Sequence, residues 1–186
     1  SNGNRYCALF SGTSGYYSTD GCQTFTLFVS TLTNNNDVNC DAAEDRLYCV
    51  NNQYNFYFDG TDDIAFTAVA NLQYIRLHRN RCFASGASGA PYRVYFSALG
   101  DCTSWTTGID YFDIAANDGD IVTGIGYIIY DTLTFYKKYS AWMLKGVDPN
   151  SFQLFNINKE IGAKNQRSIQ NLFNMQFFDS VGPNGG

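Results

Sequence analysis

The sequence predicts an all-β protein with a β-propeller-like fold of about four to five blades of antiparallel strands. Aromatic residues make up 17% of the 186 residues, with 14 Tyr and 15 Phe against 3 Pro, and both Tyr and Phe favour strands. Short apolar runs are bounded by Gly, Asn and Asp, which is typical of consecutive hairpins. A weak internal repeat has a spacing close to the ~40–50 residues of one propeller blade.

The repeat joins a polar turn, a short β-rich run, a second turn and an aromatic run that ends near Gly. Four stretches follow this order, namely 4–21, 44–61, 79–101 and 130–146. Their turn residues are Arg5, Arg46, Arg81 and Thr132. The aromatic runs open, at spacings of 37, 38 and 47 residues, with Tyr17, Tyr54, Tyr92 and Tyr139. A fifth copy begins at 171–178, with Asn174 in its turn.

Taken in order, these runs predict antiparallel hairpins over 44–58, 74–97 and 121–144. The last span divides into strands Ile121–Tyr130, Leu133–Tyr136 and Tyr139–Leu144, and the absence of a helical period there favours strands buried on both faces. We expect helix in less than about a tenth of the chain, because the one candidate segment, 159–170, contains Gly162 and has mixed polarity. A β-sandwich or a jelly roll is the main competing architecture.

We expect residues 1–186 to form a single propeller-like domain that is part of a longer chain or assembly. Blades need a neighbour on each face, and about four to five of them leave the ring incomplete. The strand-rich ends near 4–10 and 171–178 would then present unpaired edges, which are templates for another chain. The sequence therefore predicts a homo-oligomer or a larger complex.

The charge distribution excludes a sequence-reading nucleic-acid protein. The formal net charge is −5, with eight acids and two bases in residues 1–75 and nine acids and ten bases in residues 76–186. A nucleic-acid reader needs a basic face. No run approaches the ~20 apolar residues of a membrane helix, so we expect no membrane insertion.

The six cysteines leave two states open. No two of them form a CxxC pair, and the single histidine cannot complete a zinc site of the usual spacing. Three disulfides are permitted by the even number, whereas strand positions such as Cys7 and Cys49 also suit a free buried thiol. The cysteines are Cys7, Cys22, Cys40, Cys49, Cys82 and Cys102.

Candidate catalytic and metal residues all have a structural interpretation that we favour. His78 lacks a nucleophilic partner and is expected at a blade edge or groove. Carboxylate pairs could hydrolyse glycosides, but most of the acids lie beside Gly, Asn or Thr and suit turns. These acids are Asp62, Asp63, Asp110, Asp113, Asp118, Asp120 and Asp148.

Two further motifs are also interpreted as turns. The segment Asn117–Asp120 lacks the spacing and the closing Glu of an EF-hand, and a tight turn with Gly119 at positive φ is the alternative that we favour. Gly124 and Gly126 do not precede a helix, so they form no phosphate-binding loop. We therefore predict no catalytic residues, no metal and no cofactor, and hence no enzyme.

The aromatic surplus has two interpretations. Trp105, Trp142, Tyr16 and Tyr17 could stack on sugars, as in a receptor- or glycan-binding module, or they could fill the interfaces between blades. Aromatic side chains in strands usually pack, so we favour packing, although Trp105 is expected in a loop. No ligand-binding residue is assigned.

The second half of the chain carries a set of short motifs in a fixed order. These are RVYFSALGD (93–101), TSWTT (103–107), DGDIVTG (118–124), LTFYKKYS (133–140), IGA (161–163) and RSI (167–169), preceded by DRLY (45–48) and YFDGT (57–61). Their order resembles a family of virion proteins of tailed bacteriophages and prophages, similar to the β-propeller tail hub or nozzle proteins of short-tailed phages. Cys102 stands where that family usually has proline, and Cys49 and Cys82 where it has Ile or Leu.

The resemblance implies a structural component of a phage tail, located in the virion and assembled in the host cytoplasm. Its partners would be other tail proteins and further copies of itself, with DNA passing through a channel without specific binding. The alternative is a receptor- or glycan-binding module of a phage tail or a cell surface. A glycosidase is the third hypothesis, which turnover of chromogenic glycosides would test.

Overall fold

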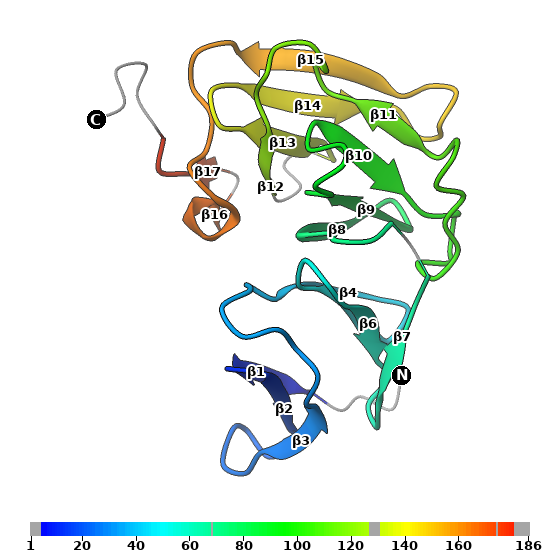
Figure 1. Cartoon of the computed structure of the whole chain (residues 1–186), viewed down its shortest axis with the longest axis vertical. Helices are drawn as coiled ribbons and strands as arrows, with labels where there is room; N and C mark the ends of the chain where they lie inside the picture. Colours follow the sequence, from blue (N-terminus) through cyan, green and yellow to red (C-terminus); the bar gives the residue numbers. More distant parts are fainter. Residues whose placement is uncertain (1–4, 68, 127–130, 174, 181–186) are drawn as a thin grey trace.

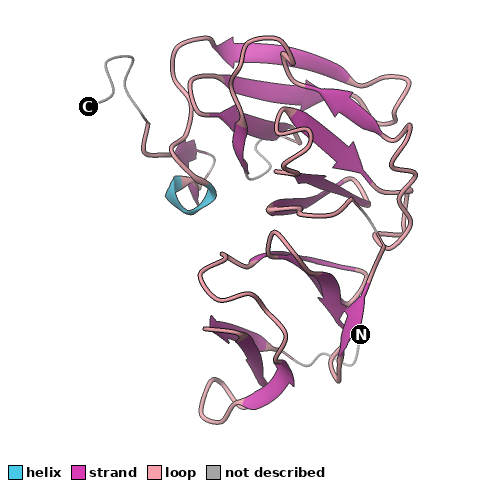
Figure 2. Cartoon of the chain, viewed as in Figure 1, coloured by secondary structure: helices cyan, strands magenta, loops and turns pink. Residues whose placement is uncertain are grey.

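The computed structural model describes residues 5–67, 69–126, 131–173 and 175–180. Within these residues the chain forms strands, turns and one 3-10 turn at Gln166–Ser168, and it contains no α-helix (Figure 2). The all-β prediction is therefore confirmed. Residues 159–169 form a loop that carries only this 3-10 turn, as the sequence predicted, and Gln170 already begins the next strand.

The strands form a series of antiparallel sheets in which neighbours in the sheet are also neighbours in the chain. The first sheet has three strands, β1 (Cys7–Ser11), β2 (Ser14–Ser18) and β3 (Thr26–Val29). The second has β4 (Asn39–Ala43), β5 (Arg46–Val50), β6 (Asn55–Phe58) and β7 (Asp63–Ala65). The third has β8 (Tyr74–His78), β9 (Arg81–Ser85), β10 (Arg93–Phe96) and β11 (Tyr111–Asp113). The fourth has β12 (Val122–Ile125), β13 (Leu133–Lys137), β14 (Ala141–Lys145) and β15 (Gln153–Asn158). The C-terminal hairpin pairs β16 (Gln170–Leu172) with β17 (Met175–Phe177).

The turn between the first two strands has the same backbone geometry in the second sheet and in the third. Glu44 and Asp45 both have positive φ, and so do Arg79 and Asn80. Two such residues in a two-residue loop match the right-handed twist of the flanking strands. The turns before β13 and β17 likewise contain a positive-φ residue, at Asp131 and Phe173. These turns mark β5, β9, β13 and β17 as equivalent strands.

The predicted repeat is largely confirmed by these equivalences. Arg46 and Arg81 begin β5 and β9, and Thr132 directly precedes β13. One position is corrected, because Tyr17 lies inside β2 whereas Tyr54 precedes β6; the shorter first hairpin shifts the alignment. The predicted hairpins over 44–58 and 74–97 are observed, and β12, β13 and β14 pair within 121–144. Residues 127–130 and Asn174 lie outside the described residues.

A separate hydrophobic cluster fills each junction between successive sheets. Side chains alternate along a strand, so that β5 sends Cys49 towards the first sheet and Tyr48 towards the third. In the same way β9 sends Cys82 towards the second sheet and Phe83 towards the fourth. The middle sheets are thus buried on both faces, which explains the apolar runs in the sequence.

The sheets follow one another along an arc, from the first sheet at one end to the fourth, and the C-terminal hairpin returns beside β12 and β13 (Figure 1). The expected four to five blades correspond to three four-stranded sheets, one three-stranded sheet and one hairpin in the described part of the chain. These residues form an open arc, and no ring closes within them.

Candidate functional site

A groove of about 830 Å³ lies between the first and second sheets. One wall is aromatic and consists of Tyr6, Tyr17 and Phe58, and the other is charged. We call this cavity the sheet groove. Its full lining is Tyr6, Ala8, Tyr17, Ala42, Ala43, Glu44, Asp45, Arg46, Leu47, Phe58, Asp59, Gly60 and Leu77.

The aromatic wall is a packed set of rings. The ring centroids of Tyr17 and Phe58 are 4.8 Å apart, and Tyr6 meets the edge of Phe58 at 5.9 Å. Tyr6 nevertheless keeps 45% of its surface exposed. Gly60 has a φ of +102°, and a Cβ there would lie 3.1 Å from the Tyr6 hydroxyl. A glycine is therefore needed for the Tyr6 ring to close this wall.

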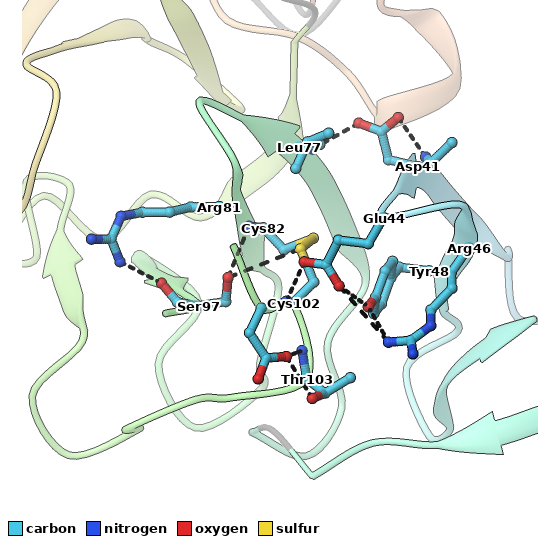
Figure 3. Close-up of a disulfide and its surroundings, with 12 residues drawn as sticks. Asp41, Glu44, Arg46, Tyr48, Leu77, Arg81, Cys82, Ser97, Cys102 and Thr103 are labelled. Carbon is cyan, nitrogen blue, oxygen red and sulfur yellow. Dashed lines mark hydrogen bonds and ion pairs between the residues drawn. A yellow bond between two sulfur atoms is a disulfide. The ribbon is translucent and has the colours of Figure 1, made fainter. Parts of the chain in front are cut away.

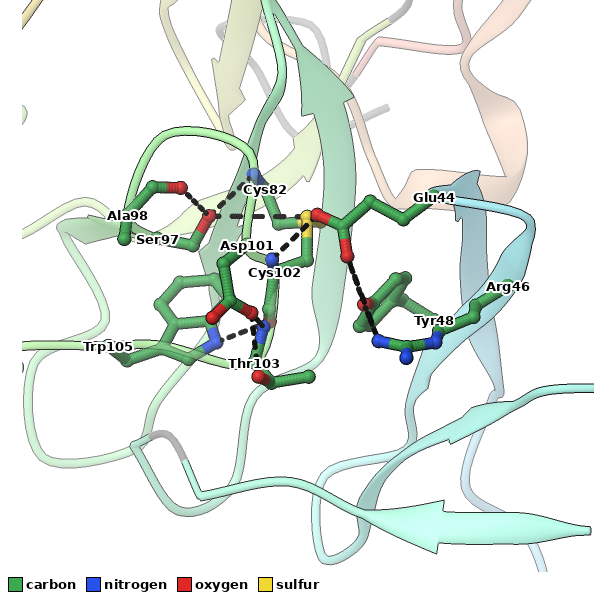
Figure 4. Close-up of polar contacts among 10 residues, drawn as sticks. All are labelled: Glu44, Arg46, Tyr48, Cys82, Ser97, Ala98, Asp101, Cys102, Thr103 and Trp105. Atoms are coloured by element: carbon green, nitrogen blue, oxygen red, sulfur yellow. Dashed lines mark hydrogen bonds and ion pairs between the residues drawn. A yellow bond between two sulfur atoms is a disulfide. The ribbon is translucent and has the colours of Figure 1, made fainter.

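The charged wall is organised by Glu44 in the turn between β4 and β5. Its Oε2 accepts a hydrogen bond from the Tyr48 hydroxyl at 2.8 Å, and its Oε1 accepts one from the backbone N–H of Cys102 at 3.0 Å (Figure 4). Burial, the largest cause, raises the pKa of Tyr48 to about 12, so its hydroxyl stays protonated and donates. Glu44 thereby ties the second sheet to the loop after β10.

Arg46 lies beside this carboxylate at the rim of the sheet groove. Its guanidinium is 4.6 Å from the centre of the Tyr57 ring and 3.8 Å from Glu44 Oε2. A cation over an aromatic face is held by the ring quadrupole. Because more than a third of the Arg46 side chain is exposed, the guanidinium remains reachable from solvent for a ligand.

The disulfide Cys82–Cys102 fixes the far end of this network (Figure 3). The Ser97 hydroxyl accepts from the backbone N–H of Cys82 at 3.0 Å and donates to the carbonyl of Ala98 at 2.9 Å. Trp105 donates its indole N–H to the Cys102 carbonyl at 2.8 Å. The loop that presents the Cys102 N–H to Glu44 is therefore held by a covalent bond and by hydrogen bonds. A second disulfide joins the cross-strand partners Cys40 and Cys49.

These contacts suit binding better than proton transfer. Both Glu44 oxygens already accept hydrogen bonds. Backbone N–H groups of Asp62 and Thr61 hold the pKa of Asp59 below its usual value, which makes it a poor general acid. The sheet groove can offer an exposed ring, ionised carboxylates and a guanidinium to a polar ligand.

His78 belongs to β8, the edge strand of the third sheet, and its side chain is buried. It ends β8 with 3% of its surface exposed, and its ring lies 6.1 Å from Phe83. Among the described residues its Nδ1 finds no hydrogen-bond partner. Burial is the largest influence on the pKa of His78 and lowers it. The charge of Asp131 raises this pKa by a smaller amount, so the net shift is downward. The expected edge position therefore matches the place of β8 in the third sheet, although the side chain is buried there and does not line the sheet groove.

The turn at Asn117–Asp120 has the predicted structural role. Gly119 adopts a φ of +73°. Asp118 accepts from the buried ammonium of Lys137, which also donates to the carbonyls of Ile114 at 3.1 Å and Ala115 at 3.3 Å. Asp120 accepts from the backbone N–H groups of Lys138 and Tyr139 at 3.2 and 3.0 Å. The two aspartates connect this turn to the β13–β14 turn.

The remaining candidate acids are spread over different sheets. Asp113 forms a two-point ion pair with Arg93, at 2.6 and 2.9 Å. Asp63 accepts from the Tyr54 hydroxyl at 2.8 Å, and Asp148 caps the turn at Ser151. Asp62 and Asp110 contribute backbone carbonyls to neighbouring turns. None of the seven candidate acids, Asp118 and Asp120 included, lines the sheet groove.

The candidate aromatic residues also lie in different parts of the structure. Trp105 stacks on Phe66 with an interplanar angle of 16°, and Trp142 donates its indole N–H to Ser140 at 2.9 Å. Of the four, only Tyr17 lines the sheet groove. Sequence reasoning missed Tyr6 and Glu44 as site residues. The charged turn 44–46 was the available signal, since it places charges beside an aromatic run.

Metal-ligating side chains do not gather in the described residues. Nowhere among them are three His, Cys, Asp or Glu side chains grouped so as to hold a metal ion. The same part of the chain has no helix that is long and apolar enough to cross a membrane.

Comparison with known proteins adds no relative: no protein-family model matches the sequence, and no curated protein matches it.

Proposed function

We propose that this chain is a structural module of a tailed-phage virion, a β-propeller-like hub, nozzle or adaptor piece that acts by assembly and not by catalysis. The observation that carries the proposal is the pair of apolar faces at the two ends of the series of sheets. The ordered motifs of the second half, with their resemblance to tail proteins, support the same function. The successive antiparallel sheets and their equivalent turns support the propeller-like geometry.

The first end face belongs to the first sheet. Its inner side packs Phe10, Tyr17 and Phe28 towards the second sheet. On its outer side, cross-strand pairing places Leu9, Tyr16 and Leu27 in one row. Leu9 and Leu27 are 49% and 51% exposed. A row of apolar side chains across three strands is the type of surface that the other sheets bury.

The second end face belongs to the C-terminal hairpin. Gln176 faces inward, and its Oε1 accepts from the hydroxyls of Thr134 at 2.8 Å and Tyr136 at 2.6 Å. The opposite side carries Leu172, paired with Met175, and Phe177, each more than half exposed. This face therefore repeats the apolar character of the first one at the other end of the chain.

The proposed occupant of each end face is the opposite end face of a second copy. Every junction inside the chain is sheet against sheet with an apolar cluster between them, and a head-to-tail contact continues this pattern. The first 75 residues carry a net charge of −6, from two bases and eight acids, and residues 76–186 carry +1, from ten bases and nine acids. This asymmetry favours head-to-tail over head-to-head contact. Such heterologous contacts build rings or filaments.

The side chains on the inside of the arc support the proposal that DNA passes through a channel there without being bound. A basin of about 290 Å³ there, next to the starts of β4 and β8, is lined mainly by amide side chains, by Val38 and Tyr74, and by the ion pair Arg167–Asp37 at 2.6 Å. Tight binding of DNA needs unpaired basic groups that displace its counterions. Two disulfides support the proposed final location in an oxidising environment, the exterior of a virion, after assembly in the host cytoplasm.

Light scattering of the purified chain at micromolar concentrations tests the proposal. We expect the mass to rise with concentration, because a stable contact buries at least ~1,000 Å². Leu27→Asp or Met175→Asp should each abolish this rise. Ile109→Asp is the matched control, because Ile109 is 74% exposed but lies in a loop away from both end faces.

Mixing the two variants sharpens the test. Leu27→Asp keeps an intact hairpin face and Met175→Asp keeps an intact first-sheet face, so an equimolar mixture should form a dimer and nothing larger. A wild-type chain that stays monomeric at every concentration would overturn the assembly proposal. An image of the assembled particle would then establish the neighbours and the symmetry.

A glycan-binding module is the second candidate, and the exposed Tyr6 ring beside Asp59 and Arg46 in the sheet groove favours it. Sugars stack on such rings and accept hydrogen bonds from guanidinium groups. A glycan array tests this candidate. Binding should be lost in Tyr6→Ala and retained in Tyr139→Ala, because Tyr139 does not line the sheet groove. An array without signal would remove this candidate.

A further inference from the structure

The two cysteines outside the observed disulfides lie next to each other in the first sheet. Cys7 begins β1, and Cys22 follows β2 in the turn 19–25. The Cys7 thiol lies close enough to the Cys22 thiol to change the protonation of Cys22. Cys22 is exposed and Cys7 is partly exposed, so reagents in solution can reach the pair.

The backbone of the first sheet holds this arrangement. Cys7 is the cross-strand partner of Ser18 in the β1–β2 ladder. The Ser18 hydroxyl accepts a hydrogen bond from the backbone N–H of Cys22 at 3.0 Å. Ser18 therefore places Cys22 beside Cys7, on the sheet edge where the chain reverses.

Asp20 makes the turn rigid. One of its oxygens accepts from the Ser18 hydroxyl at 2.6 Å, and the other accepts from the Thr24 hydroxyl at 2.6 Å. The backbone N–H groups of Gln23 and Thr24 also donate to it, each at 3.0 Å. The entropy of bringing the two thiols together is thus lost when the sheet folds, before any bond between the sulfurs forms.

We propose that Cys7 and Cys22 are a redox modification site that closes into a third disulfide by exchange with a small-molecule disulfide such as oxidised glutathione. A thiolate of the pair attacks one glutathione sulfur and releases one glutathione thiolate. The second cysteine then attacks the protein sulfur of this mixed disulfide and releases the second glutathione. Two protein thiols are oxidised, one oxidised glutathione is reduced to two thiols, and the two protons pass to the released glutathiones.

The site differs from the Cys82–Cys102 disulfide in its exposure. Cys82 and Cys102 are completely buried, whereas Cys22 is exposed. Exchange requires access to a sulfur, so the Cys7–Cys22 bond can form and be reduced in the folded chain, and it would be reduced before the buried Cys82–Cys102 bond. The neighbouring Cys7 thiol, and to a smaller extent the charge of Asp20, raise the pKa of Cys22, which makes closure faster in alkaline than in neutral buffer. This inference rests on the geometry of the first sheet, and because Cys7 lies on the same side of β1 as Leu9, its test is made at a protein concentration at which the chain is monomeric.

The test is non-reducing peptide mapping of the full chain after exchange with oxidised glutathione at alkaline pH and alkylation of the remaining thiols. We expect a linked pair of peptides that contains Cys7 and Cys22, with no alkylated cysteine left. Gentle reduction with reduced glutathione should release these two thiols before those of Cys82 and Cys102. Alkylation of both residues, a stable glutathione adduct on either, or pairing with another cysteine would overturn the proposal.

Two variants separate the role of the turn from that of the thiols. Cys22→Ser should leave Cys7 as a free thiol or as a glutathione adduct. Asp20→Ala loosens the turn and should lower the equilibrium constant of closure roughly tenfold, because one or two residues regain backbone freedom. Asp148→Ala is the matched control, since Asp148 caps a similar turn beside β15. An equal decrease in both variants would contradict the role of Asp20.

Discussion

The third and fourth sheets differ from the two ends of the chain in how their faces are used. At their junction, Phe83, Phe135 and Leu144 are buried between two sheets. At the ends, Leu27 and Phe177 lie on sheets of the same kind but face solvent. The local structure is alike, so the difference lies in whether a neighbouring sheet is present. Stability in this molecule is therefore a property of junctions more than of single sheets.

The largest expected effect separates a junction residue from an end-face residue of the same type. Phe135→Ala should lower the free energy of unfolding by about 3–5 kcal/mol, because it opens a cavity at a fully buried site where the ring meets the edge of Phe112 at 5.6 Å. Phe177→Ala should change it by less than about 0.5 kcal/mol in the monomer. Urea unfolding at low protein concentration measures both, and equal losses would erase the distinction between junctions and ends.

The next effect concerns the disulfide that stabilises the junction of the second and third sheets. Removing it in the double variant Cys82→Ala/Cys102→Ala should cost about 3 kcal/mol, since it closes a loop with a sequence separation of 20. Cys40→Ala/Cys49→Ala should cost less, because its separation is 9. Thermal unfolding with and without reductant checks the order. If removal of Cys40–Cys49 lowers the stability more than removal of Cys82–Cys102, the entropy of loop closure does not control the contribution of these disulfides.

A smaller change in the free energy of unfolding is expected when the buried ammonium group of Lys137 in the fourth sheet is removed. Lys137→Met keeps the volume but leaves the carbonyls of Ile114 and Ala115 and the carboxylate of Asp118 without their donor. We expect a loss of about 2 kcal/mol, below the value for a fully buried pair because Asp118 is partly exposed. Lys145→Met, on the exposed end of β14, is the matched control and should leave the unfolding midpoint unchanged.

The sequence predicted the strands and the repeat because both depend on local patterns. Alternating apolar residues and two-residue turns are readable from neighbours in the chain, and the Asp118–Asp120 turn was placed correctly for the same reason. The sheet groove was not predictable in this way. It joins Tyr6, Glu44 and Gly60 across two sheets, and their approach depends on how those sheets pack.

The cysteines and the histidine show the same limit. The pairing of Cys82 with Cys102 depends on where the loop after β10 folds, which no local pattern fixes. His78 follows a strand alternation that the sequence does show, but the side that becomes buried depends on the neighbouring sheets. The sequence predicts an incomplete ring, and the propeller architecture of which it would be part stays a prediction, because ring closure depends on contacts beyond the described arc.

The smallest expected effect is a pH dependence that arises inside the third sheet. Burial lowers the pKa of His78 in the folded state below the ordinary value of 6.5, so the unfolded chain binds the proton more readily. Stability should therefore be constant above about pH 7.5, fall as the pH drops through 6.5, and level off once the folded state also becomes protonated. The nearby charges act in opposite directions, since Asp131 raises and Arg79 lowers this pKa. Because His78 is the single histidine of the sequence, urea midpoints at pH 7.5, 6.5 and 5.5 report mainly on it. His78→Gln should flatten this part of the profile while leaving the carboxylate-dependent loss at lower pH. A profile that keeps its slope in this variant would mean that the buried imidazole is not its source, and that the middle of the molecule carries no charge-sensitive site between pH 5.5 and 7.5.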